Sequence, residues 1–258
     1  MTTYAPQPGS APWPTKVIAH TRMEFKLLLR NGEQLLLALV IPLGLLLLLG
    51  GTGLGNRLPL GDARPIDDAV PRVLALAVLS SSFTSLAIAT GFERRYGVIK
   101  RLGASPLSRT GLLAGKIGAV LAVQLIQLVV LIGAGFALGW KPVGGPDAVF
   151  GVVLMVLCGT AAFASLGLLM AGVLRAEATL AAANLIYLLL LVGGAVLTPV
   201  DEYPAGMQGV VRLLPSAALA SGLANSTIEG VVPWAAALSL ALWAAVIGYL
   251  VSRTFRWD

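Results

Sequence analysis

Six long apolar runs dominate this 258-residue sequence. An α-helix needs about 20 predominantly apolar residues to cross a hydrocarbon core ~30 Å thick. Only 12% of the residues are charged, roughly half the ~25% of an ordinary soluble domain. This disfavours a soluble enzyme, a disordered chain and a transmembrane β-barrel. We therefore expect an all-α membrane protein with six transmembrane helices, at about 34–55, 73–92, 112–138, 148–174, 178–198 and 231–251.

The residues before the first run divide into two parts. Residues 1–12 are polar and Pro-rich, which predicts a disordered cytoplasmic tail. Residues 13–31 carry an apolar face at helical spacing, with basic residues outside it, and this predicts an amphipathic helix in the inner membrane interface. The alternative is a cytoplasmic helix packed on a soluble partner. The apolar face comprises Val17, Ile18, Thr21, Phe25, Leu28 and Leu29; the cations are Lys16, Arg22, Lys26 and Arg30.

The basic residues predict the orientation of the six spans. With both termini, the 93–111 loop and the 175–177 hinge on one side, that side holds 13 Lys and Arg, counting Lys116, and the other holds 5. Cytoplasmic loops are enriched in Lys and Arg. We expect a multi-pass protein of the cell inner membrane with both termini in the cytoplasm. The net charge of +6 is then explained by topology, and nucleic acid is not an expected partner.

This sequence lacks the residues that most catalytic sites require. A single cysteine, Cys158, and a single histidine, His20, argue against thiolate or zinc sites and a histidine relay. Arg72 and Lys116 lie near span ends, where they can snorkel. The acids Asp67, Asp68, Asp201 and Glu202 are expected to be solvated loop charges. We predict no catalytic residue, no bound metal and no cofactor in this chain.

The segment from Gly111 to Lys116 resembles the start of a nucleotide-binding P-loop. A P-loop has four residues between its glycines and Ser or Thr after the lysine. Here three residues separate Gly111 from Gly115, and Ile117 follows the lysine. We therefore expect that this chain does not hydrolyse ATP by itself, and that the two glycines form a small-xxx-small helix contact.

The segment between the second and third runs, FERRYGVIKRLGASPLSRTGLLAGK, differs from an ordinary loop. Positive-inside topology alone would explain its basic residues. It does not explain a two-turn helix between Gly97 and Pro106 that would expose Val98, Ile99 and Leu102. Such a helix is suited to dock into a groove on another protein.

The run E-R-R-x-G-x-[I/L]-x-x-L-x-x-[S/T]-P-L over residues 93–107 resembles the signature loop of ABC-2-type transporter permeases. These are membrane subunits of bacterial ABC exporters, including the daunorubicin-resistance type. The resemblance covers residues 13–258, including a long outer loop after the fifth span. That loop has Gly193, Gly194, Pro199, Tyr203–Pro204 and Leu214–Pro215.

The resemblance implies an ATP-driven exporter made of separate subunits. Two permease chains, as a homodimer or heterodimer, would lie in the membrane lipids over two cytoplasmic ATPase subunits, which would bind ATP and Mg. The 93–106 loop would act as the coupling helix that contacts the ATPase. The implied contacting residues are Glu93, Arg94, Arg95, Gly97, Ile99, Lys100, Arg101, Leu102, Ser105 and Pro106.

Polar residues inside the spans are candidates for a substrate pathway. Ser81 and Ser85 lie on the second span, Asn184 and Tyr187 on the fifth. The resemblance places both spans near the central pathway, although hydrogen bonding between helices, to which Gln124 and Gln127 would also contribute, is the alternative.

An uncharged pathway favours an amphiphilic substrate such as a drug, antibiotic, lipid or glycolipid, as in multidrug efflux and antibiotic resistance. We expect residues 199–230 to form short interfacial or re-entrant helices; a plain loop is the alternative. Two other functions stay open, an ion-coupled secondary transporter and a non-transporting membrane assembly subunit.

Overall fold

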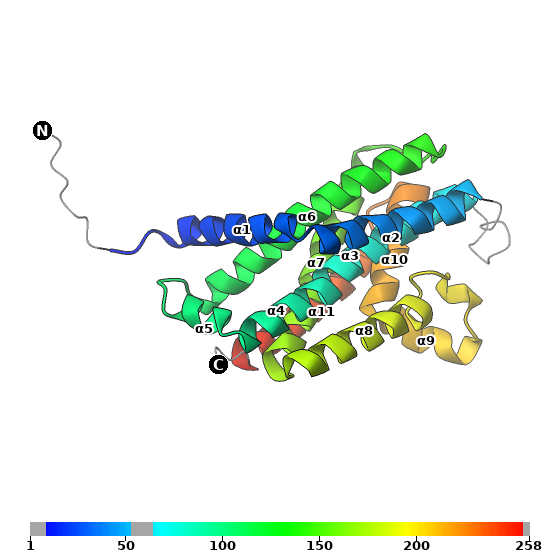
Figure 1. Cartoon of the computed structure of the whole chain (residues 1–258). Helices are drawn as coiled ribbons and strands as arrows, with labels where there is room; N and C mark the ends of the chain where they lie inside the picture. Colours follow the sequence, from blue (N-terminus) through cyan, green and yellow to red (C-terminus); the bar gives the residue numbers. More distant parts are fainter. Residues whose placement is uncertain (1–8, 53–63, 255–258) are drawn as a thin grey trace, which may run out of the picture.

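The computed structural model describes residues 9–52 and 64–254, which form helices and no strand. The predicted tail at 1–12 lies mostly outside the described residues. Figure 1 shows an elongated helical bundle, with α5 and the C-terminal end of α11 at one end. The elements are α1 (Trp13–Arg30), α2 (Gly32–Gly51), α3 (Pro65–Leu79), the π-helix η2 (Ser80–Ser85), α4 (Leu86–Arg95), α5 (Val98–Gly103), α6 (Arg109–Ala137), α7 (Pro146–Val173), α8 (Ala176–Gly193), η3 (Val200–Glu202), α9 (Ala205–Leu213), α10 (Pro215–Ala224), the π-helix η4 (Asn225–Glu229) and α11 (Trp234–Thr254).

Five of the six predicted spans are helices long and apolar enough to cross a membrane. They are Pro65–Arg95, α6, α7, α8 and α11. For the first predicted span, the described apolar stretch in α2 is Ala38–Gly51, which is shorter than a membrane crossing and contains Pro42. The chain is therefore a multi-pass membrane protein, and the sixth crossing stays a prediction.

The second predicted span is the most deeply buried of the five candidate membrane spans. It runs without a break through α3, η2 and α4, and residues 69–79 are all buried. Its middle is the serine-rich SSSFTS segment, which forms a π-helical turn. Ser81 Oγ donates to the carbonyl of Ala77 at 2.7 Å, and Ser82 Oγ donates to that of Val78 at 2.5 Å. Hydroxyls that bond to the preceding turn in this way bend helices, and π-helical turns often occur at functional sites.

Short helices replace a plain loop after α8, as expected. α9 lies at the surface, whereas α10 is buried among α3, α7 and α11. Prolines begin both segments: Pro204 precedes α9 and Pro215 opens α10, where a missing backbone N–H is tolerated. In α10 the small residues of PSAALASGLA allow close packing against the long helices.

α1 packs along α6 rather than presenting all of its apolar face to lipid. Val17, Thr21 and Phe25 are half-buried, whereas Ile18 is 66% exposed. The buried positions of the helix are His20 and Glu24, which are polar. A helix spans Trp13–Arg30, within one residue of the predicted bounds, but much of its apolar face is covered by the chain itself, and its place in the membrane interface stays a prediction.

Glycines on α6 make this close approach feasible. A Cβ at Gly115 would collide with the ring of His20, and one at Gly118 would lie 3.0 Å from Thr21 Oγ1. The two helices are therefore in contact at backbone distance, as small-residue contacts in membranes allow. The expected helix contact at Gly115 is confirmed.

Gly115→Leu should displace α1 from α6. Overpacking of a tight contact costs about 1–3 kcal/mol, so we expect a lower free energy of unfolding in detergent and faster proteolysis within α1. Gly133→Leu is the matched control on the same helix, because a Cβ at Gly133 meets nothing within 4 Å. Equal effects of the two substitutions would contradict this packing.

Candidate functional site

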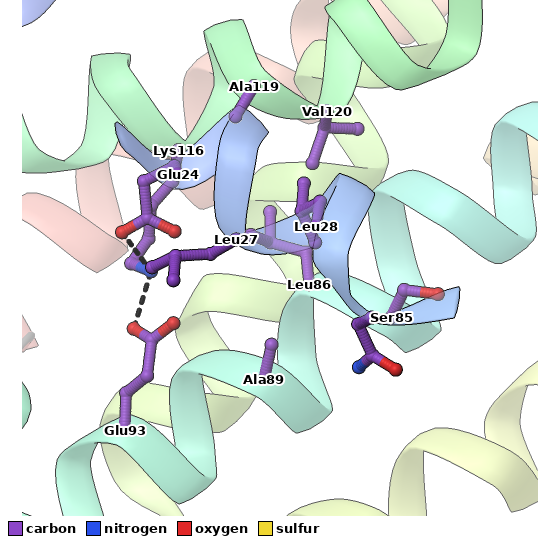
Figure 2. A pocket seen from close by; sticks show the side chains of 11 residues that line it. Glu24, Leu27, Leu28, Ser85, Leu86, Ala89, Glu93, Lys116, Ala119 and Val120 are labelled. Atoms are coloured by element: carbon purple, nitrogen blue, oxygen red, sulfur yellow. Dashed lines mark hydrogen bonds and ion pairs between the residues drawn. The ribbon is translucent and has the colours of Figure 1, made fainter. Parts of the chain in front are cut away.

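A buried lysine joins three helices at the end of the bundle that carries α5. Lys116 Nζ, in the first turns of α6, lies 3.0 Å from Glu24 Oε1 of α1 and 2.5 Å from Glu93 Oε2 of α4. The Lys116 side chain is only 1% exposed. Figure 2 shows the two carboxylates approaching the ammonium from opposite sides. We call Glu24, Glu93, Lys116 and the adjacent His20 the ion cluster.

His20 extends this cluster along α1. Its Nε2 lies 3.4 Å from Glu24 Oε1, one helical turn away, and its side chain is buried. Burial lowers the pKa of His20 below its ordinary value, and the Lys116 ammonium lowers it further, while Glu24 acts in the opposite direction. The neutral imidazole is therefore favoured.

A cavity of about 160 Å³ lies between α1, α4 and α6 beside the ion cluster (Figure 2). Apolar side chains, the two carboxylates and the lysine line it. Its lining residues are Glu24, Leu27, Leu28, Asn31, Ser85, Leu86, Ala89, Glu93, Lys116, Ala119 and Val120.

Arg72 and Lys116, which could snorkel from the span ends, are instead buried. Arg72 is 6% exposed and donates to both oxygens of Asp68, at 2.6 and 3.0 Å. Asp68 is likewise buried, so it is not a solvated loop charge. Both cations stay inside because acids on neighbouring turns or helices neutralise them, which removes the need to reach the interface.

The ion cluster was not predicted from the sequence, although the sequence contains two signals of it. Lys116 stands within an apolar helix with no acid one turn away, which implies a partner from elsewhere in the fold. His20 and Glu24, spaced i and i+4 on α1, mark the polar stripe that faces it.

The basic residues that follow Glu93 bind other helices of the same chain. Arg94 donates to the carbonyls of Ala171 and Leu174, at 2.7 and 3.2 Å, and so caps the C-terminus of α7. Arg95 pairs with Glu177 at the start of α8. These contacts bring the ends of α4, α7 and α8 together.

α5 presents a narrower surface than the sequence suggested. Gly97 has φ +70°, a left-handed conformation suited to glycine, and it separates α4 from α5. The predicted exposure of Ile99 is wrong: this side chain is fully buried in a cluster with Leu112 and Leu86, because it anchors α5 to the bundle. Leu102 is half-buried, and the exposed residues are Tyr96, Val98, Lys100, Arg101, Gly103, Ala104, Ser105 and Pro106.

A groove of about 670 Å³ lies between α2, the η2–α4 region and α8. It brings together Ser85, Asn184 and Tyr187, three of the four candidate pathway residues. It adjoins the cavity of the ion cluster, with which it shares Asn31, Ser85 and Ala89. The complete lining is Asn31, Ala38, Ile41, Pro42, Ser80, Thr84, Ser85, Ile88, Ala89, Leu180, Asn184 and Tyr187.

Ser81, the fourth candidate, does not line this groove. It accepts a hydrogen bond of 2.9 Å from Gln124 Nε2 of α6, and Thr160 of α7 donates to Gln124 Oε1 at 2.6 Å. For these residues, hydrogen bonding between helices is what the structure shows. Gln127 similarly donates to the carbonyl of Ala38 at 2.9 Å.

The family model described as ABC-2 type transporter matches residues 15–227, which include most of α1, all of α5, the ion cluster and the groove. The chain belongs to this family. ABC-2 membership supports a membrane permease subunit of an ABC transporter, consistent with the apolar helices of the fold. A comparison with curated proteins finds no match.

Lys116→Met should destabilise the ABC-2 fold strongly. Removing one partner of a buried ion pair leaves an uncompensated charge, which costs about 3–5 kcal/mol. We expect this loss in the free energy of unfolding in detergent, and partial recovery when Glu24→Gln and Glu93→Gln are added. Lys100→Met, at an exposed lysine of α5, is the control. A loss no larger than the control's would contradict a charged cluster.

Acidification should weaken the fold through His20. Because the pKa of His20 is lowered in the folded state, the unfolded chain binds the proton more readily, and stability falls as the pH drops below about 6.5. His20→Gln should make the fall between pH 7 and 5 shallower, since this is the chain's single histidine. Identical pH profiles of unfolding for the two proteins would contradict the burial of a neutral imidazole.

Proposed function

We propose that this chain is the permease subunit of an ATP-driven exporter that moves an amphiphilic substrate out of the cytoplasm or the inner leaflet. The substrate would be a drug, antibiotic, lipid or glycolipid. The observation that carries the proposal is the groove between α2, η2–α4 and α8 in a chain of the ABC-2 family. In this proposal α2 completes the sixth crossing, and both termini and α5 lie on the cytoplasmic side of the inner membrane.

The lining of the groove supports an amphiphilic substrate. Ile41, Ile88 and Leu180 supply apolar surface, and Ser85, Asn184 and Tyr187 supply hydroxyl and amide groups. Among the described lining residues there is no charged side chain. A lining of this kind binds the apolar part of a ligand, and its few polar groups fix the ligand's orientation.

A second permease chain would close the open side of this groove. The exposed apolar side chains of α8, such as Leu185, Leu188 and Leu189, suit contact with lipid or with a partner helix. The pathway would then run between two copies, or between this chain and a homologue.

The exposed residues of α5 would receive the force from a separate cytoplasmic ATPase. That subunit would bind ATP and Mg, since we expect no hydrolysis by this chain alone. Rigid connections support transmission: Ile99 anchors α5 to the bundle, and Arg94 and Arg95 bind the ends of α7 and α8. ATP binding would thereby favour one arrangement of the helices that flank the groove.

The combined change Lys100→Glu and Arg101→Glu should release the ATPase. Both residues are exposed on α5, so reversing their charge should remove docking without unfolding the chain. We expect the ATPase that co-purifies with the wild-type chain to be lost, together with ATP-dependent transport in vesicles. Arg212→Glu, an exposed cation on α9, is the control.

Retention of the ATPase by the α5 variant would contradict the role of α5. Transport by vesicles that lack any ATPase would favour an ion-coupled carrier instead. Glu93→Ala is a poor test of docking, because Glu93 faces Lys116 inside the bundle.

A further inference from the structure

The cavity of the ion cluster and the groove of the proposed function are adjacent spaces. Asn31, Ser85 and Ala89 line both of them. The cavity, at about 160 Å³, is far larger than the ~10–15 Å³ that one water molecule needs. It therefore has room for an ammonium group and the methylene groups next to it, while the groove of about 670 Å³ has room for the rest of a small molecule.

The lining of the cavity carries a net negative charge, whereas the lining of the groove carries none. The charged residues of the cavity are Glu24, Glu93 and Lys116, so two carboxylates face one ammonium. His20 adds no positive charge, because burial lowers its pKa and favours the neutral imidazole. A ligand that occupies both spaces is therefore complemented by one positive charge at the end that enters the cavity.

Each carboxylate of the cluster leaves one oxygen for a ligand. Lys116 Nζ donates to Glu24 Oε1 and Glu93 Oε2, and no hydrogen bond to Glu24 Oε2 or Glu93 Oε1 occurs among the described residues. In Figure 2 these second oxygens are turned away from the lysine contacts, to the side on which Leu27 lies. The Glu24 side chain is only 9% exposed. A carboxylate oxygen in such a site is stabilised most by a donor that carries positive charge.

Ser85 stands where the two spaces meet, and it fits the same ligand. No hydrogen bond of its hydroxyl occurs among the described residues, so this oxygen can accept from an amine. An anionic head group would instead meet the carboxylates of Glu24 and Glu93. A purely apolar ligand would leave their second oxygens without a donor.

We propose that the substrate of this permease is a cationic amphiphile, whose protonated amine enters the cavity and donates to Glu24 and Glu93 while its apolar body lies in the groove. The assignment rests on the proposed function, because it names the class of substrate that the same pathway takes.

The test is a titration of the detergent-solubilised full chain with dansylcadaverine, a fluorescent amphiphile that ends in a primary amine. Its N-acetyl derivative has the same dansyl body and alkyl chain but no charge, and both probes are measured against empty micelles. We expect the amine to bind about tenfold more tightly than the derivative, the effect of one hydrogen bond between charged groups.

Glu93→Gln separates the effect of the charge from that of the groove. Glutamine keeps the size of the side chain and can still accept from Lys116, but the lining of the cavity becomes neutral. We expect the amine to bind this variant about as weakly as the N-acetyl derivative does. The derivative should bind as to the wild type, which also shows that the variant is folded. Glu229→Gln, the same change at an exposed glutamate, is the matched control and should affect neither probe.

Three results would overturn the proposal. The first is equal, saturable binding of the two probes to the wild type, which would keep the groove as a substrate site and remove only the preference for a cation. The second is an equal loss of amine binding in Glu93→Gln and Glu229→Gln, which would assign the preference to the overall charge of the chain. The third is full displacement of the amine by phosphatidylethanolamine, which would assign the site to a zwitterionic lipid of the bilayer.

Failure of the proposed function gives a different result. If neither probe binds saturably to the folded wild-type chain, the groove holds no amphiphile, and the substrate pathway is contradicted together with its preference for a cation.

Discussion

The buried charge of Lys116 constrains the arrangement of the helices around it. An ammonium that is 1% exposed is tolerated only when paired, and here its two carboxylates come from two other helices, α1 and α4. This requirement holds α1 against α6 and fixes the end of α4 from which α5 projects. The glycines of α6 make the same contact sterically feasible. A helix that looks like a peripheral membrane element is thereby built into the bundle.

Some polar residues of the second span form hydrogen bonds in the core, and others line the groove. Their spacing in the sequence alone does not tell the two groups apart. In the π-helical turn, Ser81 and Ser82 face the core, where Ser81 joins a hydrogen-bonded chain with Gln124 and Thr160. Ser85 faces the groove with Asn184 and Tyr187. A regular α-helix and a π-helical turn direct successive side chains differently, so the division of these serines follows from the local change in helical winding.

Hydrophobic length predicted most of the fold, and it did so for a physical reason. Five runs became the expected long helices because a membrane-spanning segment must satisfy its backbone hydrogen bonds internally, which leaves a helix as the simple solution. The candidate site was predicted in part. Ser85, Asn184 and Tyr187 lie together as expected, whereas Ser81, Ile99 and the buried ions differ, because the partners of a side chain in another helix are invisible to a scan along the chain.

The sequence by itself determined an all-helical membrane protein, the approximate positions of the long helices and the ABC-2 resemblance carried by the loop after Glu93. These follow from local properties, namely apolar length, glycine and proline positions and a contiguous motif. Only the tertiary structure decided that Glu24 and Glu93 enclose Lys116, that Arg72 pairs with Asp68 inside the bundle, and that the cavity of the ion cluster adjoins the groove. Charge pairing and cavity shape depend on which helices meet, and that is set by the packing of residues far apart in the chain.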